Sequence, residues 1–193
     1  MNKKIAILLS GRGSNFLAIH EAIQRGDLNA EICCVISNVP GAAGLERACE
    51  FGLHTIYLPS KDIERTQYDQ LLVDALRPLN PALICLAGFM RILSPVFISE
   101  FPSRILNIHP ALLPAFPGLH AQRQALRHGV KVSGCTVHFA NEGVDTGPII
   151  MQRAVDVFEN DTEDSLSARI LEQEHQIYWR AISKVLEMIN LSQ

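Results

Sequence analysis

Short apolar runs alternate with amphipathic segments through the first half of the chain. The runs at 5–9, 31–37, 54–58 and 82–87 are mostly apolar, and each is followed within two residues by glycine, asparagine or proline. Runs of this length are typical of strands buried in a parallel sheet. Between them, apolar positions three and four apart predict helices through 16–23 and over 45–51 and 61–79. The side chains expected to face the core from the last of these helices are Ile63, Leu71, Leu72, Ala75 and Leu76.

The second half of the chain has fewer helices between its strands. Ser94 and Pro95 are typical of a helix start, and Gly129 is typical of a helix end, so short helices are predicted up to 101 and over 122–128. Strands are predicted at 103–108, 133–140 and 148–157, the second of them half-buried because polar and apolar residues alternate along it. A final helix is expected to be capped by Asp161 or Thr162 and to bury Leu171, Tyr178, Ile182, Val185 and Ile189.

This order of elements predicts an α/β fold. We expect one Rossmann-like, doubly wound, mostly parallel sheet with helices on both faces, whose C-terminal strands are partly antiparallel. The 193 residues suit a single domain over 1–193, with a core of ordinary size.

Composition narrows the class of protein. Hydrophobic residues make up 48% and charged residues 19% of the chain, which excludes a disordered protein. The net charge of −3 gives no basic surface for nucleic acid, and no apolar run approaches the ~20 residues of a membrane helix. The apolar run 5–9 is too short for a signal peptide. Five cysteines without a CxxC spacing indicate buried thiols in a reducing cytoplasm, and neither a disulfide framework nor a metal site.

A glycine loop follows the first predicted strand. Gly11, Gly13, Ser14 and Asn15 lie between that strand and a helix, where free backbone N–H groups and the helix dipole favour an anion. Phe16 replaces the third glycine of the dinucleotide fingerprint, so a single phosphate is expected in preference to a dinucleotide. The alternative is a plain tight turn.

The segment around Asn107 and His109 is the main candidate for chemistry. These residues are two apart on a predicted strand, so their side chains project from the same face at its carboxyl end. An amide can donate to an oxyanion, and an imidazole can move a proton. Asp145, in the polar loop after the next strand, is expected to pair with His109, raise its pKa and hold the imidazolium. A capped strand end is the alternative interpretation.

Four motifs resemble those of the folate-dependent formyltransferase family. They are FMRILSP at 89–95, LNIHPALLP at 106–114, PGLHAQRQAL at 117–126 and GCTVHFANEGVDTGPII at 134–150. The resemblance extends from residue 5 to about 178. It implies transfer of a formyl group from 10-formyltetrahydrofolate to the amine of glycinamide ribonucleotide, a step of purine biosynthesis, with no metal. It also implies that the N-terminal half binds the ribonucleotide and the C-terminal half binds folate and carries out catalysis.

The resemblance also assigns roles to individual residues. It implies a ribonucleotide site at Gly11, Arg12, Gly13, Ser14, Asn15 and Glu174, a folate site at Arg65, Met90, Arg91, Ile92, Leu93, Asn107 and Val144, and a catalytic set of Asn107, His109 and Asp145. Without it, Met90, Ile92 and Leu93 would be interpreted equally well as core residues. His138 is expected to support the site without reacting, and His120 is the other competing histidine. Ala111 and Trp179 depart from the family pattern, and these departures affect only the expected local geometry of the loops.

Several alternatives remain open at this point. A methionyl-tRNA formyltransferase would be expected to carry a further, more basic domain, and a formyltetrahydrofolate hydrolase an N-terminal regulatory domain. A folate- or nucleotide-binding module without turnover would not need Asn107, His109 and Asp145 together, and Phe16 counts against an NAD-dependent oxidoreductase. The expected partners are small molecules only, with no nucleic acid or membrane, for a cytoplasmic monomer or homodimer.

Overall fold

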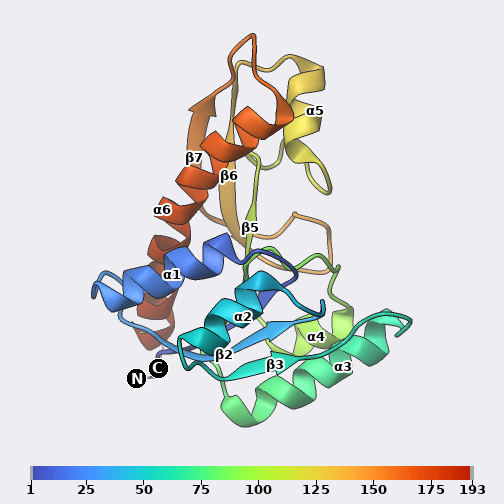
Figure 1. Ribbon diagram of the computed structural model, residues 1–193, viewed down its shortest axis with the longest axis vertical. Helices are drawn as coiled ribbons and strands as arrows, with labels where there is room; N and C mark the ends of the chain where they lie inside the picture. Colours follow the sequence, from blue (N-terminus) through green and yellow to red (C-terminus); the bar gives the residue numbers. More distant parts are fainter. Residues whose placement is uncertain (1, 192–193) are drawn as a thin grey trace.

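A single seven-stranded sheet organises the structure, a computed structural model that describes residues 2–191 (Figure 1). The strands lie in the order β3-β2-β1-β4-β5-β6-β7. Neighbours from β3 to β5 pair in parallel, and the β5–β6 and β6–β7 pairs are antiparallel, which confirms the predicted mixed sheet. The strands are β1 (Lys4–Leu9), β2 (Glu31–Ser37), β3 (Thr55–Tyr57), β4 (Leu83–Leu86), β5 (Ile105–His109), β6 (Val132–Phe139) and β7 (Ile149–Asp156).

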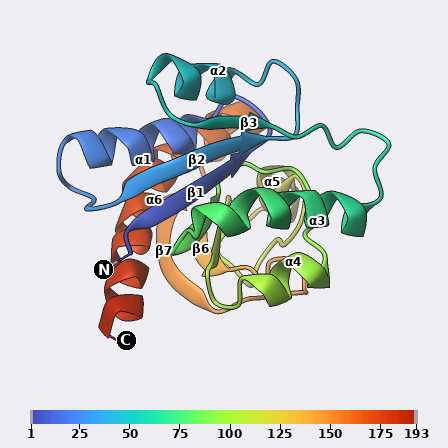
Figure 2. The same cartoon turned by 90° about the horizontal axis from the view of Figure 1, so that it is seen from below.

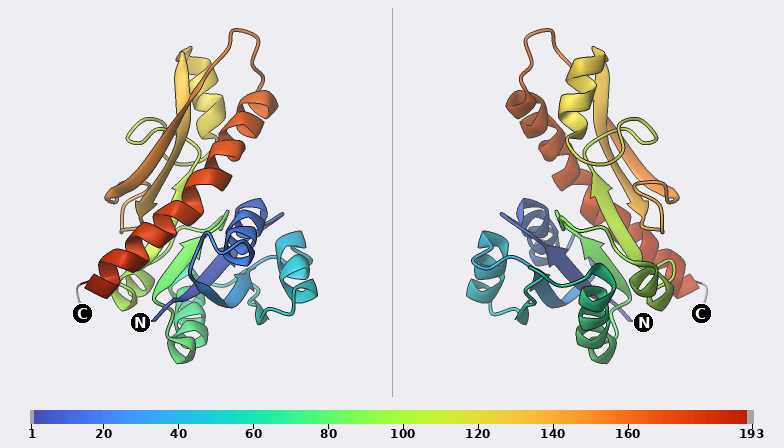
Figure 3. Two further views of the ribbon diagram at one scale, coloured as in Figure 1. Left: turned by 90° about the vertical axis from the view of Figure 1, so that its left-hand side faces the viewer. Right: turned by 90° about the vertical axis from the view of Figure 1, so that its right-hand side faces the viewer.

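Helices cover both faces of the sheet, as Figures 2 and 3 show from further directions. On β1, Ile5, Ile7 and Leu9 pack into one hydrophobic cluster, while Ala6 and Leu8 pack into a second cluster on the opposite face. The first cluster is completed by α1 (Ser14–Gln24), α2 (Ala43–Glu50), α5 (Ala121–His128) and α6 (Glu163–Leu191), and the second by α3 (Arg65–Leu76) and α4 (Pro95–Glu100). The apolar runs of β1, β2 and β4 are therefore buried on both sides, as predicted, whereas the edge strand β3 is only partly covered and Tyr57 is exposed.

The predicted helix over 61–79 is shorter in the structure. It begins at Arg65 because the Glu64 carboxylate accepts hydrogen bonds from the backbone N–H groups of Thr66 and Gln67 and so caps the first turn. The end of the predicted helix is a separate 3₁₀ turn at Arg77–Leu79. The expectation that Leu71 faces the core was also wrong, because its side chain is exposed.

The expectation of a half-buried β6 was wrong as well. Its polar and apolar residues do alternate, but both sides are covered. Cys135 and Val137 pack into the first cluster, whereas Thr136 on the opposite side donates to the Ala111 carbonyl and accepts from the Leu113 N–H. The loop after β5 thus covers the polar face of β6 in place of water.

The long helix α6 connects the two halves of the sheet. Thr162 caps it, accepting a hydrogen bond from the Ser165 N–H. Near its middle, the Tyr178 hydroxyl lies 3.0 Å from the carbonyl oxygens of both Leu86 and Leu106, which belong to the neighbouring strands β4 and β5. Within residues 2–191, no helix combines the length and apolar character needed to cross a membrane.

Candidate active site

The loop between β1 and α1 leaves backbone N–H groups free at the start of the helix. Gly13 precedes the helix with φ of +73°, and no side chain caps the first turn. The first N–H groups of the helix therefore have no partner within it and can donate to a ligand. A Cβ atom on Gly13 would lie 2.7 Å from the Cα of Gly44, so the backbones before α1 and in α2 are in contact and admit no side chain.

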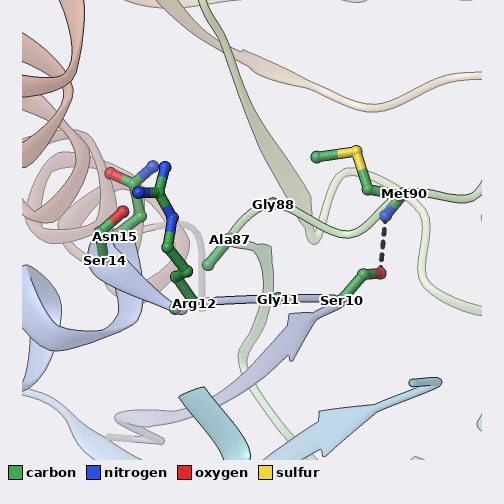
Figure 4. A pocket seen from close by; sticks show the side chains of 9 residues that line it. Ser10, Gly11, Arg12, Ser14, Asn15, Ala87, Gly88 and Met90 are labelled. Atoms are coloured by element: carbon green, nitrogen blue, oxygen red, sulfur yellow. Dashed lines mark hydrogen bonds between the residues drawn. The ribbon is translucent and has the colours of Figure 1, made fainter. Parts of the chain in front are cut away.

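A cavity of about 320 Å³ lies beside this loop. Residues of the β1–α1 loop and of the segment after β4 surround it (Figure 4). Its lining residues are Ser10, Gly11, Arg12, Gly13, Ser14, Asn15, Ala87, Gly88 and Met90. The structure thus brings five of the six predicted ribonucleotide residues to one cavity, with Arg12 exposed at its edge.

The sixth, Glu174, contacts this group from α6. Its Oε2 accepts a hydrogen bond of 2.7 Å from the Asn15 amide, and both side chains are buried. Burial raises the pKa of Glu174 to about 7, although the hydrogen bond from Asn15 acts in the opposite direction. The Asn15 Oδ1 atom has no partner among the described residues. The pair therefore presents an unsatisfied acceptor and a carboxyl group that titrates near neutrality.

Asn107, His109 and Asp145 form a second cluster, at the carboxyl end of β5. The His109 Nδ1 lies 3.2 Å from Asp145 Oδ2, and the Asn107 Nδ2 donates to Asp145 Oδ1 at 3.3 Å. Asp145 has φ of +54° in the loop between β6 and β7, and its Oδ2 also accepts from the Gly118 N–H at 2.8 Å. One carboxylate thus connects the amide, the imidazole and the loop after β5.

The electrostatics of His109 differ from the prediction. Burial lowers its pKa, and the opposing effects of the Phe116 carbonyl and the Asp145 charge do not compensate. The expectation that Asp145 raises the pKa above its ordinary value was therefore wrong, because His109 is almost completely buried. Its Nε2 lies 2.8 Å from the Phe116 carbonyl oxygen, so both ring nitrogens face acceptors.

The charge on Asp145 is maintained despite partial burial. Burial raises its pKa, but hydrogen bonds from His138 and the Gly118 N–H, together with the charges of the two histidines, lower it below the ordinary value overall. Asp145 is therefore a carboxylate at neutral pH, placed between two imidazoles.

His138 belongs to this cluster more closely than the sequence indicated. It lies opposite Asn107 in the β5–β6 register, and its Nε2 is 3.2 Å from Asn107 Nδ2 and 3.5 Å from Asp145 Oδ1. Its Nδ1 lies 2.9 Å from the Phe139 carbonyl oxygen, so Nε2 is the ring nitrogen that faces both the Asn107 amide and the Asp145 carboxylate. His120, by contrast, is exposed at the start of α5.

The segment 90–93 that the sequence assigned to folate is largely open to solvent. Met90 and Ile92 are 71% and 57% exposed, so the interpretation of these two as core residues was wrong, whereas Leu93 is buried. The Arg91 guanidinium packs over the Tyr68 ring at 4.4 Å. Two other predicted folate residues are exposed in different elements, Arg65 at the first turn of α3 and Val144 in the β6–β7 loop.

Comparison with known proteins identifies the family. Residues 3–182 match the family described as formyl transferase. The chain is 48% identical, over 187 residues, to the Drosophila melanogaster trifunctional purine biosynthetic protein adenosine-3, covering 95% of this chain but only 14% of that protein. It is 45% identical to the Escherichia coli phosphoribosylglycinamide formyltransferase, over 93% of this chain and 85% of that protein.

A solved structure shares the fold. The crystal structure of glycinamide ribonucleotide transformylase 1 from Symbiobacterium toebii superposes with a TM-score of 0.91 at 49% identity, over 94% of this chain and 86% of that one. The chain therefore belongs to the formyl transferase family, as both the sequence match and the superposition indicate.

Proposed function

We propose that the chain transfers the formyl group of 10-formyltetrahydrofolate to the amine of glycinamide ribonucleotide, in purine biosynthesis. The observation that carries the proposal is the bridging position of Asp145, which contacts an amide donor and a buried imidazole at one point. A binding module has no need of this combination, whereas acyl transfer uses each part. The names of the relatives in Escherichia coli and Symbiobacterium toebii support the same reaction.

The chemistry requires no covalent enzyme intermediate. The neutral amine of the ribonucleotide attacks the formyl carbon, and a C–N bond forms as the carbonyl oxygen becomes an oxyanion. Asn107 donates to this oxyanion in place of its long contacts to His138 and Asp145. The surplus proton of the attacking amine passes through water and Asp145 to His109, and His109 delivers a proton to N10 as the bond between N10 and the formyl carbon breaks.

The same proposal assigns the two substrates to the two sides of the site. The phosphate binds to the loop of Gly11, Gly13, Ser14 and Asn15 with Arg12 at its edge, and Glu174 accepts from the ribose hydroxyls. The folate is bound along Met90–Leu93, with further contacts from Asn107, Val144 and Arg65. We treat 1–193 as one domain, in which the N-terminal half chiefly binds the ribonucleotide and the C-terminal half carries out catalysis.

A turnover assay tests the reaction. The protein is mixed with 10-formyl-5,8-dideazafolate and glycinamide ribonucleotide, and release of the deformylated folate is followed optically. Release that requires the ribonucleotide, and formylated ribonucleotide identified by mass spectrometry, are the expected results. Release without the ribonucleotide would identify a hydrolase instead. Binding of both compounds by folded protein without any product would leave only a binding module.

A further inference from the structure

Ser10 joins the two segments that we assign to the two substrates. It follows β1 and directly precedes the glycine loop. Its backbone N–H donates to the Gly88 carbonyl at 3.0 Å, and its hydroxyl oxygen accepts from the Met90 N–H at 2.8 Å (Figure 4). One residue of the phosphate loop therefore makes two hydrogen bonds to the segment after β4.

The hydroxyl is also part of a longer chain of hydrogen bonds. Ser10 Oγ donates to Asn38 Oδ1 at 2.6 Å, and Asn38 Nδ2 donates to Ser60 Oγ at 3.0 Å. These hydrogen bonds run in one direction, from the Met90 N–H through Ser10 and Asn38 to Ser60. This chain of hydrogen bonds connects the loops that follow β4, β1, β2 and β3, which are four neighbouring strands of the sheet.

Within the segment 88–93, Phe89 and Leu93 are buried in the second cluster and Arg91 packs over Tyr68, but Met90 and Ile92 have little contact with the core. The segment has no regular secondary structure, and the side chains of Met90 and Ile92 are largely exposed. At its far end, the Ser94 N–H is held by the buried carboxylate of Asp69. Exposed residues such as Met90 lose conformational freedom when they bind a ligand, and any contact that restrains them beforehand reduces that cost.

We propose that Ser10 is a positioning residue that couples the two substrate sites, so that a ligand held by the phosphate loop raises the affinity of the segment 88–93 for folate. A phosphate bound at 11–15 restrains the backbone on which Ser10 lies. Ser10 in turn restrains Met90, and the second ligand meets a segment that is already ordered. The inference rests on the proposed function, and linkage requires the effect to be equal in both directions.

Calorimetry measures this coupling directly. The dissociation constant of glycinamide ribonucleotide is determined alone and with saturating 5,8-dideazafolate, which has no formyl group and cannot react. In the wild-type protein we expect the folate analogue to tighten ribonucleotide binding about fivefold or more, the lower end of typical coupling between sites. In Ser10→Ala we expect the folate analogue to tighten ribonucleotide binding less than about twofold. The thermal unfolding midpoint, measured in parallel, establishes that the variant is folded.

Three further variants separate the coupling role from a structural one. Ser60→Ala is the matched control, because it shortens the same chain while both hydrogen bonds of the Ser10 hydroxyl remain, and it should keep the wild-type factor. Ser10→Thr retains a hydroxyl and should restore coupling. Asn38→Ala removes the acceptor of the Ser10 proton and should weaken coupling, which provides a test even when Ser10→Ala fails to fold.

The outcomes distinguish this inference from the proposed function. Failure of the wild-type protein to bind either compound would overturn the proposed function and the coupling with it. Binding of both compounds with a coupling factor of one, or unchanged coupling in folded Ser10→Ala, would overturn only the role of Ser10. Loss of coupling in Ser60→Ala to the same extent as in Ser10→Ala would also overturn it.

Discussion

Asn15 and Glu174 are 159 positions apart in the sequence, yet the Asn15 amide donates to the Glu174 carboxyl group at 2.7 Å. The contact joins the first turn of α1 to the middle of α6, below the cavity at the glycine loop. Because both side chains are buried, the protonation state of Glu174 affects stability as well as any ligand above it.

Replacement of Glu174 by Gln should therefore stabilise the protein at high pH. The folded-state pKa of about 7 exceeds the ordinary value of 4.5, so the folded protein retains a proton that the unfolded chain releases between these values. The wild-type free energy of unfolding should fall across this window relative to Glu174→Gln, by roughly 3 kcal/mol in all. Urea unfolding of both proteins from pH 4 to 8 measures the difference, and parallel curves would contradict it.

Asn107→Ala should lower turnover far more than it weakens the binding of folate. Removal of a single oxyanion donor typically lowers kcat by about 10²–10³. Steady-state kinetics with both substrates separate kcat from KM. A large rise in KM with unchanged kcat would show that Asn107 binds substrate and does not stabilise the transition state.

His109→Ala should lose most activity, because a positioned acid commonly contributes about 10²–10⁴ in rate. His54→Ala is a suitable control, since His54 is an exposed histidine before β3. Turnover of the two variants is compared at one pH. Retention of a tenth or more of wild-type turnover in His109→Ala would exclude its role as the acid.

Asp145→Asn should lower the pKa of His109 further. In the wild-type protein burial lowers this pKa and the Asp145 charge opposes the shift, so removal of the charge leaves burial less opposed. Nitrogen chemical shifts of the imidazole, followed by NMR during a pH titration, measure the change. A His109 pKa that rises, or that stays unchanged, would contradict this account.

The same shift predicts how stability depends on pH. A histidine with a folded-state pKa below its ordinary 6.5 contributes stability above that value and loses it as the pH falls, because the unfolded chain takes up the proton first. Asp145→Asn should extend this loss to lower pH. Urea unfolding of Asp145→Asn and the wild-type protein at pH 7 and pH 5 provides the comparison.

Gly13→Ala should destabilise the protein more than Gly52→Ala does. Both glycines have positive φ, +73° and +72°, so both substitutions bear the left-handed penalty of about 1–2 kcal/mol. Only at Gly13 would the new Cβ meet backbone, 2.7 Å from the Gly44 Cα, whereas nothing lies within 4 Å at Gly52. We expect Gly13→Ala to lose an additional ~1–3 kcal/mol of unfolding free energy, measured by denaturant unfolding. Equal losses would show that the two backbones can separate.

The sequence predicted the parts of the fold and site that depend on local periodicity. Asn107 and His109 share one end of β5 because strands have a period of two, and Glu174 lies on the buried side of α6 because helices have a period near 3.6. A supporting role for His138 was predicted, but its contact with Asn107 was not, since the antiparallel register depends on the long connection between β5 and β6. The lowered pKa of His109 follows from tertiary burial, which no local pattern encodes.

The two hydrogen bonds at the Tyr178 hydroxyl have a consequence for the order of folding. They join strands β4 and β5 to a helix that the chain reaches only near its end. Strand β1, which leads into the phosphate loop, pairs with β4, and most of the N-terminal half of the sequence lies between these two strands. Because contacts so distant in sequence form slowly, a partly folded chain has neither substrate site in place, and activity should return during refolding only with the last cooperative phase.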